Sequence, residues 1–206
     1  MPDTVQFWFD PVSPWCWTAA RWIQVVETEH DIELTFHIMS LALLNDGKQL
    51  PPPVRTIVDN SWPYLRVLAA VETRHGQPAL RALYNALGSC LHEEKTPGSS
   101  TDILTMALRA CDLDSSLAAH ADTTDYDSHI ATSHKARSDD PGTNSGAPTI
   151  RIDGNCFFGP AISRVPDGQQ AVALYGAIRT LATYPYIYEY QRARTEMPKL
   201  DRAPAN

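Results

Sequence analysis

The stretch FWFDPVSPWCW, residues 7–17, decides the fold. The apolar run 5–9 predicts a buried strand. A proline-punctuated turn follows, and Ser13 and Pro14 are typical of a helix start, with serine as the N-cap and proline in the first turn. With cysteine at position 13 the helix would begin with a C-x-x-C redox pair, whose second member is Cys16. Because position 13 is serine, the chemistry of this helix start is the central question.

The residues after this stretch predict a β-α-β unit. Apolar side chains fall near one face of a helix from Pro14 to about His30. Alternation from Ile32 to Ile38 then predicts a second strand. Two strands joined through a helix of this length are expected to be parallel.

The middle third of the chain has helical periodicity only. A loop is predicted over 45–53, and helical periods follow as far as about residue 137. Pro63 and Pro78 are each able to open a helix. Two further helix starts are predicted, at the capping pairs Thr101-Asp102 and Thr124-Asp125.

Strands return near residue 149. Thr149 to Ile152 and 156–158 predict an antiparallel hairpin, since Asp153-Gly154 suits a tight turn between them. A last helix is predicted from Gln169 to Thr183, with an aromatic tail over 184–190.

The order β-α-β, helical block, β-β-α predicts an α/β protein with a thioredoxin fold that carries an inserted all-helical domain. We expect a thioredoxin-like domain over 1–44 and 141–206, with the helical insertion over 45–140. The insertion is not expected to be an independent domain, because strand-bearing segments flank it on both sides.

Composition excludes several classes of function. The chain has 206 residues, 43% of them hydrophobic, which is enough for a sizeable core. Its formal net charge is −7 and it has no basic run, which argues against nucleic acid or an anionic membrane as partner. The N-terminus lacks the features of a signal peptide, and no apolar run is long enough to span a bilayer. The sequence therefore predicts a cytoplasmic protein.

The cysteines are widely separated. This spacing argues against a zinc site and against a disulfide framework. His129 and His134 are five residues apart, off one helical face, so no metal site is predicted. Three cysteines are expected to be buried small side chains, and Cys16 is the one to examine. The four are Cys16, Cys90, Cys111 and Cys156.

Four separated segments resemble one known family. They are FWFDPVSPWCW at 7–17, FHIMSLALLN at 36–45, GAPTIRIDGNCFFGP at 146–160 and YPYIYEYQRARTE at 184–196. Together they resemble the DsbA-like branch of the thioredoxin superfamily, and within it the actinobacterial mycothiol-dependent nitroreductases, whose helix start reads C-P-W-C-W. The related kappa-class glutathione transferases and chromene-carboxylate isomerases use serine at the position of the first cysteine. The fold is common to all of them, so it does not decide the chemistry.

The resemblance implies that a low-molecular-weight thiol, mycothiol or glutathione, acts as cosubstrate, with no tightly bound cofactor. A mycoredoxin-type reductase and a homodimer are the further partners that it suggests. Within the motif, Ser13 and Cys16 are the catalytic candidates. A cysteine at a helix start becomes a thiolate that a second cysteine resolves, whereas a serine hydroxyl stays protonated and forms no disulfide.

Three interpretations of Ser13 remain. The chain is a dithiol oxidoreductase whose first cysteine has been replaced, so that dithiol cycling is blocked. Alternatively, Ser13 donates a hydrogen bond to the sulfur of a bound thiol, as in a transferase or isomerase. In the third, Ser13 is only an N-cap and Cys16 a buried side chain, which leaves a non-catalytic thiol-binding scaffold.

The remaining candidates are expected around this helix start. The bond between Ala147 and Pro148 is predicted to be cis and to face a ligand, although a trans proline opening a strand is the ordinary alternative. The resemblance implies that Asn45 and His92 line a cavity above the site, whereas a lone histidine at a helix end is ordinarily solvated or a C-cap. Trp15 is expected to be exposed at the helix start, where it either stacks on a flat substrate or packs under the insertion. Pro14 completes the candidate set.

Overall fold

The computed structural model describes residues 1–138 and 146–200. Within these ranges a sheet of four strands has the order β2-β1-β3-β4. The elements are β1 (Asp3–Phe9), α1 (Pro14–Glu29), β2 (Ile32–Ile38), α2 (Leu41–Leu44), α3 (Pro52–Asp59), α4 (Trp62–Gly88), the π-helix η1 (Ser89–Glu93), α5 (Ser100–Ala110), the 3-10 helix η2 (Ser115–Asp122), α6 (Asp127–Ser138), β3 (Thr149–Ile152), β4 (Asn155–Phe158) and α7 (Gly168–Thr183).

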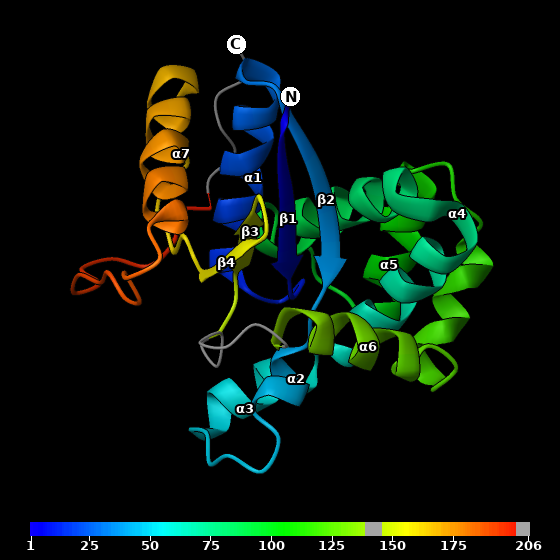
Figure 1. Cartoon of the computed structure of the whole chain (residues 1–206). Helices are drawn as coiled ribbons and strands as arrows, with labels where there is room; N and C mark the ends of the chain where they lie inside the picture. Colours follow the sequence, from blue (N-terminus) through cyan, green and yellow to red (C-terminus); the bar gives the residue numbers. More distant parts are fainter. Residues whose placement is uncertain (139–145, 201–206) are drawn as a thin grey trace.

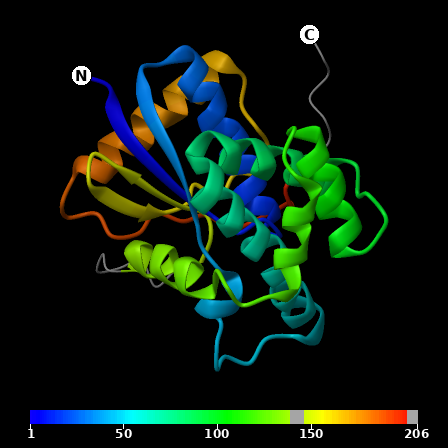
Figure 2. The same ribbon diagram turned by 90° about the vertical axis from the view of Figure 1, so that its right-hand side faces the viewer.

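The sheet has the topology predicted from the sequence. Strand β1 is parallel to β2, with Phe9 opposite Ile38, and antiparallel to β3, with Trp8 opposite Thr149. The hairpin of β3 and β4 turns at Asp153 and Gly154, both of which have positive φ. The α/β thioredoxin fold with a helical insertion is confirmed, and helices α4 to α6 gather on the β2 side of the sheet, away from α7 (Figures 1 and 2).

Side-chain alternation along β1 separates two layers. Val5, Phe7 and Phe9 are fully buried in the layer that packs against α1. The even side chains face the other way, where Trp8 donates its indole N–H to the carbonyl of Ser133 in α6 (3.1 Å). The second face is therefore covered at Trp8, whereas Gln6 is half-buried and Thr4 exposed.

The start of α1 lies at the carboxyl end of β1. Because β3 is antiparallel to β1, the residues just before Thr149 lie at this same end of the sheet. The carboxyl end of β2 lies there too, since Phe9 and Ile38 are paired. Candidate site residues from three distant parts of the sequence thus lie at the same edge of the sheet.

The inserted helices differ from the prediction at their boundaries. The helix start predicted at Pro78 is present inside α4, because Gly76 is non-helical (φ 79°, ψ −173°) and divides α4 into two helical parts, the second of which has Pro78 near its start. The start of α5 is capped by Ser99 rather than Thr101, with Asp102 completing a reciprocal capping box. Helix α6 begins at Asp127, just after the predicted cap at 124–125. The predicted boundary of the insertion at residue 140 lies outside the described residues.

Candidate functional site

Ser13 begins α1 as its N-cap. The turn after β1 closes when Ser13 N–H donates to the carbonyl of Asp10 (3.1 Å). Ser13 has extended backbone geometry, its Oγ accepts the backbone N–H of Cys16 (3.2 Å), and Pro14 follows in the first turn. The side chain therefore lies at the positive end of the helix dipole, where an anion is favoured. Ser13 is 6% exposed.

Cys16 lies one helical turn after Ser13 and is buried. It is 0% exposed, in contact with the core between α1 and α4. Burial raises the pKa of its thiol to about 12, against the weaker opposing effects of the Ser13 hydroxyl and the Asp10 backbone. All four cysteines, which lie in the described ranges, are free thiols. Cys16 is thus almost entirely protonated near neutral pH and is shielded, as predicted.

The other cysteines are only partly as expected. Cys90 is buried, but Cys111 and Cys156 are half-buried. The expectation that all three are buried is therefore wrong for two of them, because one ends helix α5 and the other belongs to the edge strand β4.

Asp10 is a residue that the sequence reasoning missed. Its carboxylate is 0% exposed and accepts two backbone N–H groups, from Val12 (3.1 Å) and from Leu41 (2.7 Å). Burial raises the pKa of this carboxyl to about 7, although both hydrogen bonds act to lower it. An aspartate directly after a buried strand and before a proline is the signal that could have revealed it. Asp10 ties the turn before Ser13 to the start of α2.

His92 lies inside the protein beside the same turn. It belongs to the π-helix η1 and is 7% exposed, so the solvated or C-capping interpretation is wrong. Its Nε2 lies 2.8 Å from the carbonyl of Pro11 and must donate to it, since a carbonyl only accepts. Burial lowers the pKa of the imidazole, which favours the neutral ring. The ring also stacks on Trp17.

Asn45 uses its side chain locally. It is the C-cap of α2, and its Nδ2 donates to the carbonyl of Leu41 (2.8 Å). The backbone carbonyl of Asn45 accepts from the guanidinium of Arg55 (3.3 Å). Asn45 and Asp10 therefore both bond to the backbone of Leu41, at its C=O and its N–H respectively, on the side of the site formed by α2 and α3.

The predicted cis bond is present. The Ala147-Pro148 peptide is cis, and Gly159-Pro160 is a second cis bond. The carbonyl of Pro148 accepts the N–H of Gly159 (2.8 Å), and Ala147 packs against the core cluster that contains Cys16. Both residues precede β3, at the edge of the sheet where α1 begins.

Trp15 is less exposed than predicted. Its ring is half-buried, and the guanidinium of Arg194 lies over it at 4.7 Å from the ring centroid. Trp15 thus has a cation partner from a distant part of the chain, which no pattern in the sequence predicts.

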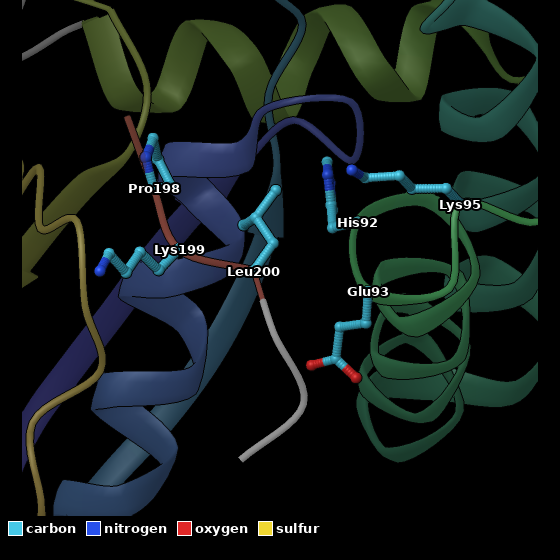
Figure 3. Close-up of a pocket in the computed structure, with 6 residues that line it drawn as sticks. All are labelled: His92, Glu93, Lys95, Pro198, Lys199 and Leu200. Atoms are coloured by element: carbon cyan, nitrogen blue, oxygen red, sulfur yellow. The ribbon is translucent and has the colours of Figure 1, made fainter. Parts of the chain in front are cut away.

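A cavity lies beside the first turns of α1. Its volume is about 290 Å³, and Figure 3 shows it between η1 on one side and the C-terminal residues on the other. Leu200 and His92 lie on facing sides, and the side chain of Lys95 extends toward His92 whereas that of Lys199 points away (Figure 3). The lining residues are His92, Glu93, Lys95, Pro198, Lys199 and Leu200. Since His92 bonds to Pro11, the cavity adjoins the turn that leads to Ser13.

The described ranges contain no group of three acidic, histidine or cysteine side chains placed to hold a metal ion. Among the helices described, none combines the length and apolar character required to span a bilayer.

Comparison with known proteins identifies the family. The model of the mycothiol-dependent nitroreductase Rv2466c family matches residues 12–192. The uncharacterized protein Rv2286c of Mycobacterium tuberculosis is 30% identical over 202 residues, which covers 93% of this chain and 83% of that protein.

Solved structures agree on the fold. The probable DsbA oxidoreductase SCO1869 from Streptomyces coelicolor has a TM-score of 0.60 at 13% identity, over 98% of this chain and all of that one. The cytosolic disulfide reductase DsbM from Pseudomonas aeruginosa, solved with GSH, has a TM-score of 0.58 at 14% identity, over 86% of this chain and 100% of that one. The fold of these structures is that of the DsbA-like proteins, and the family match over most of the sequence shows that the chain belongs to the Rv2466c-like family of mycothiol-dependent nitroreductases.

Proposed function

We propose that this protein is a thiol-dependent oxidoreductase that uses a low-molecular-weight thiol, mycothiol or glutathione, to act on a disulfide or a small electrophile such as a nitro compound. Membership of the Rv2466c-like family supports the choice of thiol. A cytoplasmic location is part of the proposal, because small thiols are kept reduced there.

The reacting sulfur is supplied by the bound thiol in this proposal. Cys16 is a poor nucleophile near neutral pH, because its thiol is buried and its pKa is raised to about 12. Ser13 cannot form a disulfide. A small thiol bound at the amino end of α1 would meet the helix dipole and the Ser13 hydroxyl, and both favour its ionised form.

The observation that carries the proposal is the position of Ser13 at the N-cap. Its Oγ is held by the Cys16 N–H at 3.2 Å, so the hydroxyl is oriented by the helix itself. Without a bound thiol, the acceptor near the hydroxyl proton is the neutral thiol of Cys16, which accepts hydrogen bonds weakly. The thiolate of a bound small thiol is a much stronger acceptor. Ser13 therefore acts as a hydrogen-bond donor to the bound sulfur.

The electrons come from the small thiol. Reduction of a nitro group to a nitroso group consumes two thiols and gives one disulfide and one water. A thiol-exchange reductase of the mycoredoxin type would then return the disulfide to the thiol. Trp15, Asn45, His92, Ala147 and Pro148 are proposed to bound the space in which the thiol and the electrophile meet.

The test is thiolate formation. Addition of mycothiol, or of glutathione in parallel, is expected to produce ultraviolet thiolate absorbance near neutral pH. The signal should be lost in Ser13→Ala and retained in Ser99→Ala, which removes a comparable N-cap serine at the start of α5. No absorbance with either thiol, or equal absorbance in Ser13→Ala, would refute this role and favour a non-catalytic scaffold.

The product distinguishes reduction from transfer. If the protein instead joins the thiol to the electrophile or isomerises the substrate, the thiol ends in a conjugate or is regenerated, with no disulfide formed. Mass spectrometry of the products with mycothiol and a nitroaromatic substrate separates these outcomes. Disulfide is the expected product.

A second candidate is a dithiol oxidoreductase that has lost its first cysteine. The sealed position of Cys16, one turn after Ser13, favours this candidate because resolving cysteines occupy such positions. In Ser13→Cys we expect a disulfide to Cys16 that mycothiol or a mycoredoxin reduces. Mass spectrometry that finds no such disulfide would eliminate this candidate.

The assignment of a thioredoxin-like domain to 1–44 and 141–206 and of an insertion to 45–140 is part of the same proposal, as is a homodimer. The β2 edge, beside which the inserted helices gather, supports this division (Figure 1). Size-exclusion chromatography with light scattering tests the dimer.

A further inference from the structure

The last described residues pass across the start of α1. We define the C-terminal strap as residues 194–200. Figure 3 shows its end, Pro198 to Leu200, passing across the first turns of α1 to reach the cavity beside His92. This segment lies outside regular secondary structure.

The strap is anchored to the loop between β4 and α7. Arg164 binds the carboxylate of Glu196 through two hydrogen bonds (2.9 and 2.8 Å), and the hydroxyl of Ser163 donates to the same carboxylate (2.5 Å). The backbone N–H of Lys199 donates to the carbonyl of Ser163 (2.7 Å). The strap is thus a defined segment rather than a loose tail.

The anchoring loop is itself bound to α1. The hydroxyl of Thr18 donates to the carbonyl of Ile162 (2.7 Å). Loop, strap and helix therefore form one unit around the candidate site. Arg194 completes it by covering the ring of Trp15, which lies between Ser13 and Cys16 in the sequence.

The apolar end of the strap closes the cavity. Pro198 is buried, and Leu200 packs against the core cluster that includes Cys16 and Trp17. The cavity is partly open to solvent, and its volume of about 290 Å³ is near the lower end of the range for small-molecule sites. A polypeptide disulfide needs an extended chain laid along the helix start and the adjoining strand edge, which is a much longer surface.

We infer that the C-terminal strap determines substrate specificity, through Arg194 and Leu200, by closing the helix start to polypeptide disulfides while leaving room for small thiol compounds. This inference rests on the proposed function, in that it names the class of compound that reaches the site. Arg194 acts by covering Trp15, and Leu200 acts by closing the far side of the cavity.

Site-specific labelling tests the strap without requiring catalysis. The double variant Ser13→Cys/Cys16→Ala places a single thiol at the helix start that cannot close a disulfide with position 16. Its modification by iodoacetamide and by a maleimide on a long polyethylene glycol chain is followed by peptide mass spectrometry. The ratio of the two rates, divided by the same ratio for a short cysteine peptide, reports steric access.

We expect the bulky reagent to be disfavoured by about tenfold or more at position 13, as is typical when reaction requires local opening. Arg194→Gln should raise its rate about two- to fivefold, and Leu200→Ala about tenfold, because each removes one contact that holds the strap closed. Arg192→Gln is the matched control, since it removes the same charge from the neighbouring chain outside the strap. It should leave the ratio unchanged.

A second measurement uses the reaction itself. The thiol at position 13 is exchanged with a small symmetric disulfide and with insulin, and the preference for the small disulfide should fall in Arg194→Gln and Leu200→Ala. Circular dichroism confirms that each variant is folded, and Arg194→Gln, an exposed position, keeps the test valid if Leu200→Ala does not fold. Equal labelling by both reagents in the double variant, or an unchanged ratio in both strap variants, would overturn the inference. If the native protein gave no thiolate absorbance with either thiol while the labelling ratios came out as expected, only the proposed function would be overturned.

Discussion

The two sides of the first turn of α1 are built in different ways. On the inner side, Cys16 is in contact with the core, with the buried groups of Asp10 and Tyr84 close by. Burial raises the pKa of the Tyr84 hydroxyl, and the charges of Cys16 and Asp10 act in the same direction. On the outer side, Trp15 is covered by the exposed side chain of Arg194. The inner side is closed by packing, whereas Trp15 on the outer side is covered by a contact with an exposed cation, which is easily exchanged.

This difference predicts opposite responses to substitution. Changes on the inner side should alter the stability of the whole protein, because close-packed groups have no room to move. Changes on the outer side should alter access to the site and leave stability nearly unchanged. The expected effects of substitutions on stability decrease from the inner side outward.

Among the substitutions, Gly88→Ala should have the largest effect on stability. Residue 88 ends α4, and an added Cβ would lie 2.2 Å from the ring of Trp17, the residue next to Cys16. Since the indole is 5% exposed and packs in the core cluster, it would lose core contacts by moving aside. We expect the free energy of unfolding, measured in urea, to fall by about 3 kcal/mol.

Gly176→Ala is the matched control for that variant. Residue 176 lies within α7, and an added Cβ there has nothing within 4 Å. The control should gain about 0.5–1 kcal/mol from helix propensity alone. If both variants lost or gained stability alike, close packing beside Trp17 would not be what holds the inner side.

Asp10 should make stability depend on pH. Burial raises the pKa of its carboxyl from 3.8 to about 7 in the folded protein. Between these values the unfolded chain has released the proton and the folded protein retains it, so stability falls as pH rises through this window and is level above it. Three pKa units correspond to about 4 kcal/mol, as an upper bound.

Asp10→Asn isolates this contribution. The variant does not titrate, so the fall in stability between about pH 4 and 7 should be absent from it. The asparagine side chain has only one oxygen, so the N–H of Val12 or that of Leu41 loses its acceptor. This loss should lower the free energy of unfolding by about 1–3 kcal/mol. The variant should therefore be less stable than the native protein near pH 4 and comparable or more stable near pH 8. Parallel curves for the two proteins would show that Asp10 is ionised throughout.

Ser13→Ala should have an intermediate effect. It removes the acceptor of the Cys16 N–H and should lower the free energy of unfolding by about 1 kcal/mol. Ser13→Gly should cost only a few tenths of that, because glycine is tolerated at an N-cap. Both variants lack the hydroxyl, so both should lose the thiolate absorbance. If the thiolate absorbance were lost in Ser13→Ala but kept in Ser13→Gly, in parallel with their stabilities, Ser13 would act only as an N-cap.

The elements that the sequence predicted are those with local signals. The strand before residue 10, the cap at Ser13, the hairpin turn at Asp153 and the cis bond before Pro148 are each specified by neighbouring residues. The order of the strands follows from them, because connections of these lengths permit few topologies.

The contacts that the sequence did not predict join distant residues. Asp10 bonds to Leu41, and His92 to Pro11, across 31 and 81 positions, with no periodic pattern connecting them. The strap has no periodicity at all, and only its tertiary contacts define it.

Arg194→Gln should have the smallest effect on stability, since a cation–π contact made by an exposed guanidinium contributes about 0.5–1 kcal/mol. Its effect should instead appear at Trp15, whose emission would shift toward that of a solvated indole and whose quenching by iodide would increase. Trp15→Phe separates this signal from that of Trp62, the other half-buried tryptophan, whereas Trp8, Trp17 and Trp22 are each 5% exposed or less. Arg192→Gln should leave both stability and quenching unchanged. If Arg194→Gln lost as much stability as Gly88→Ala, the outer side would be closed by packing like the inner side. The strap would then be part of the core and not a segment that can open.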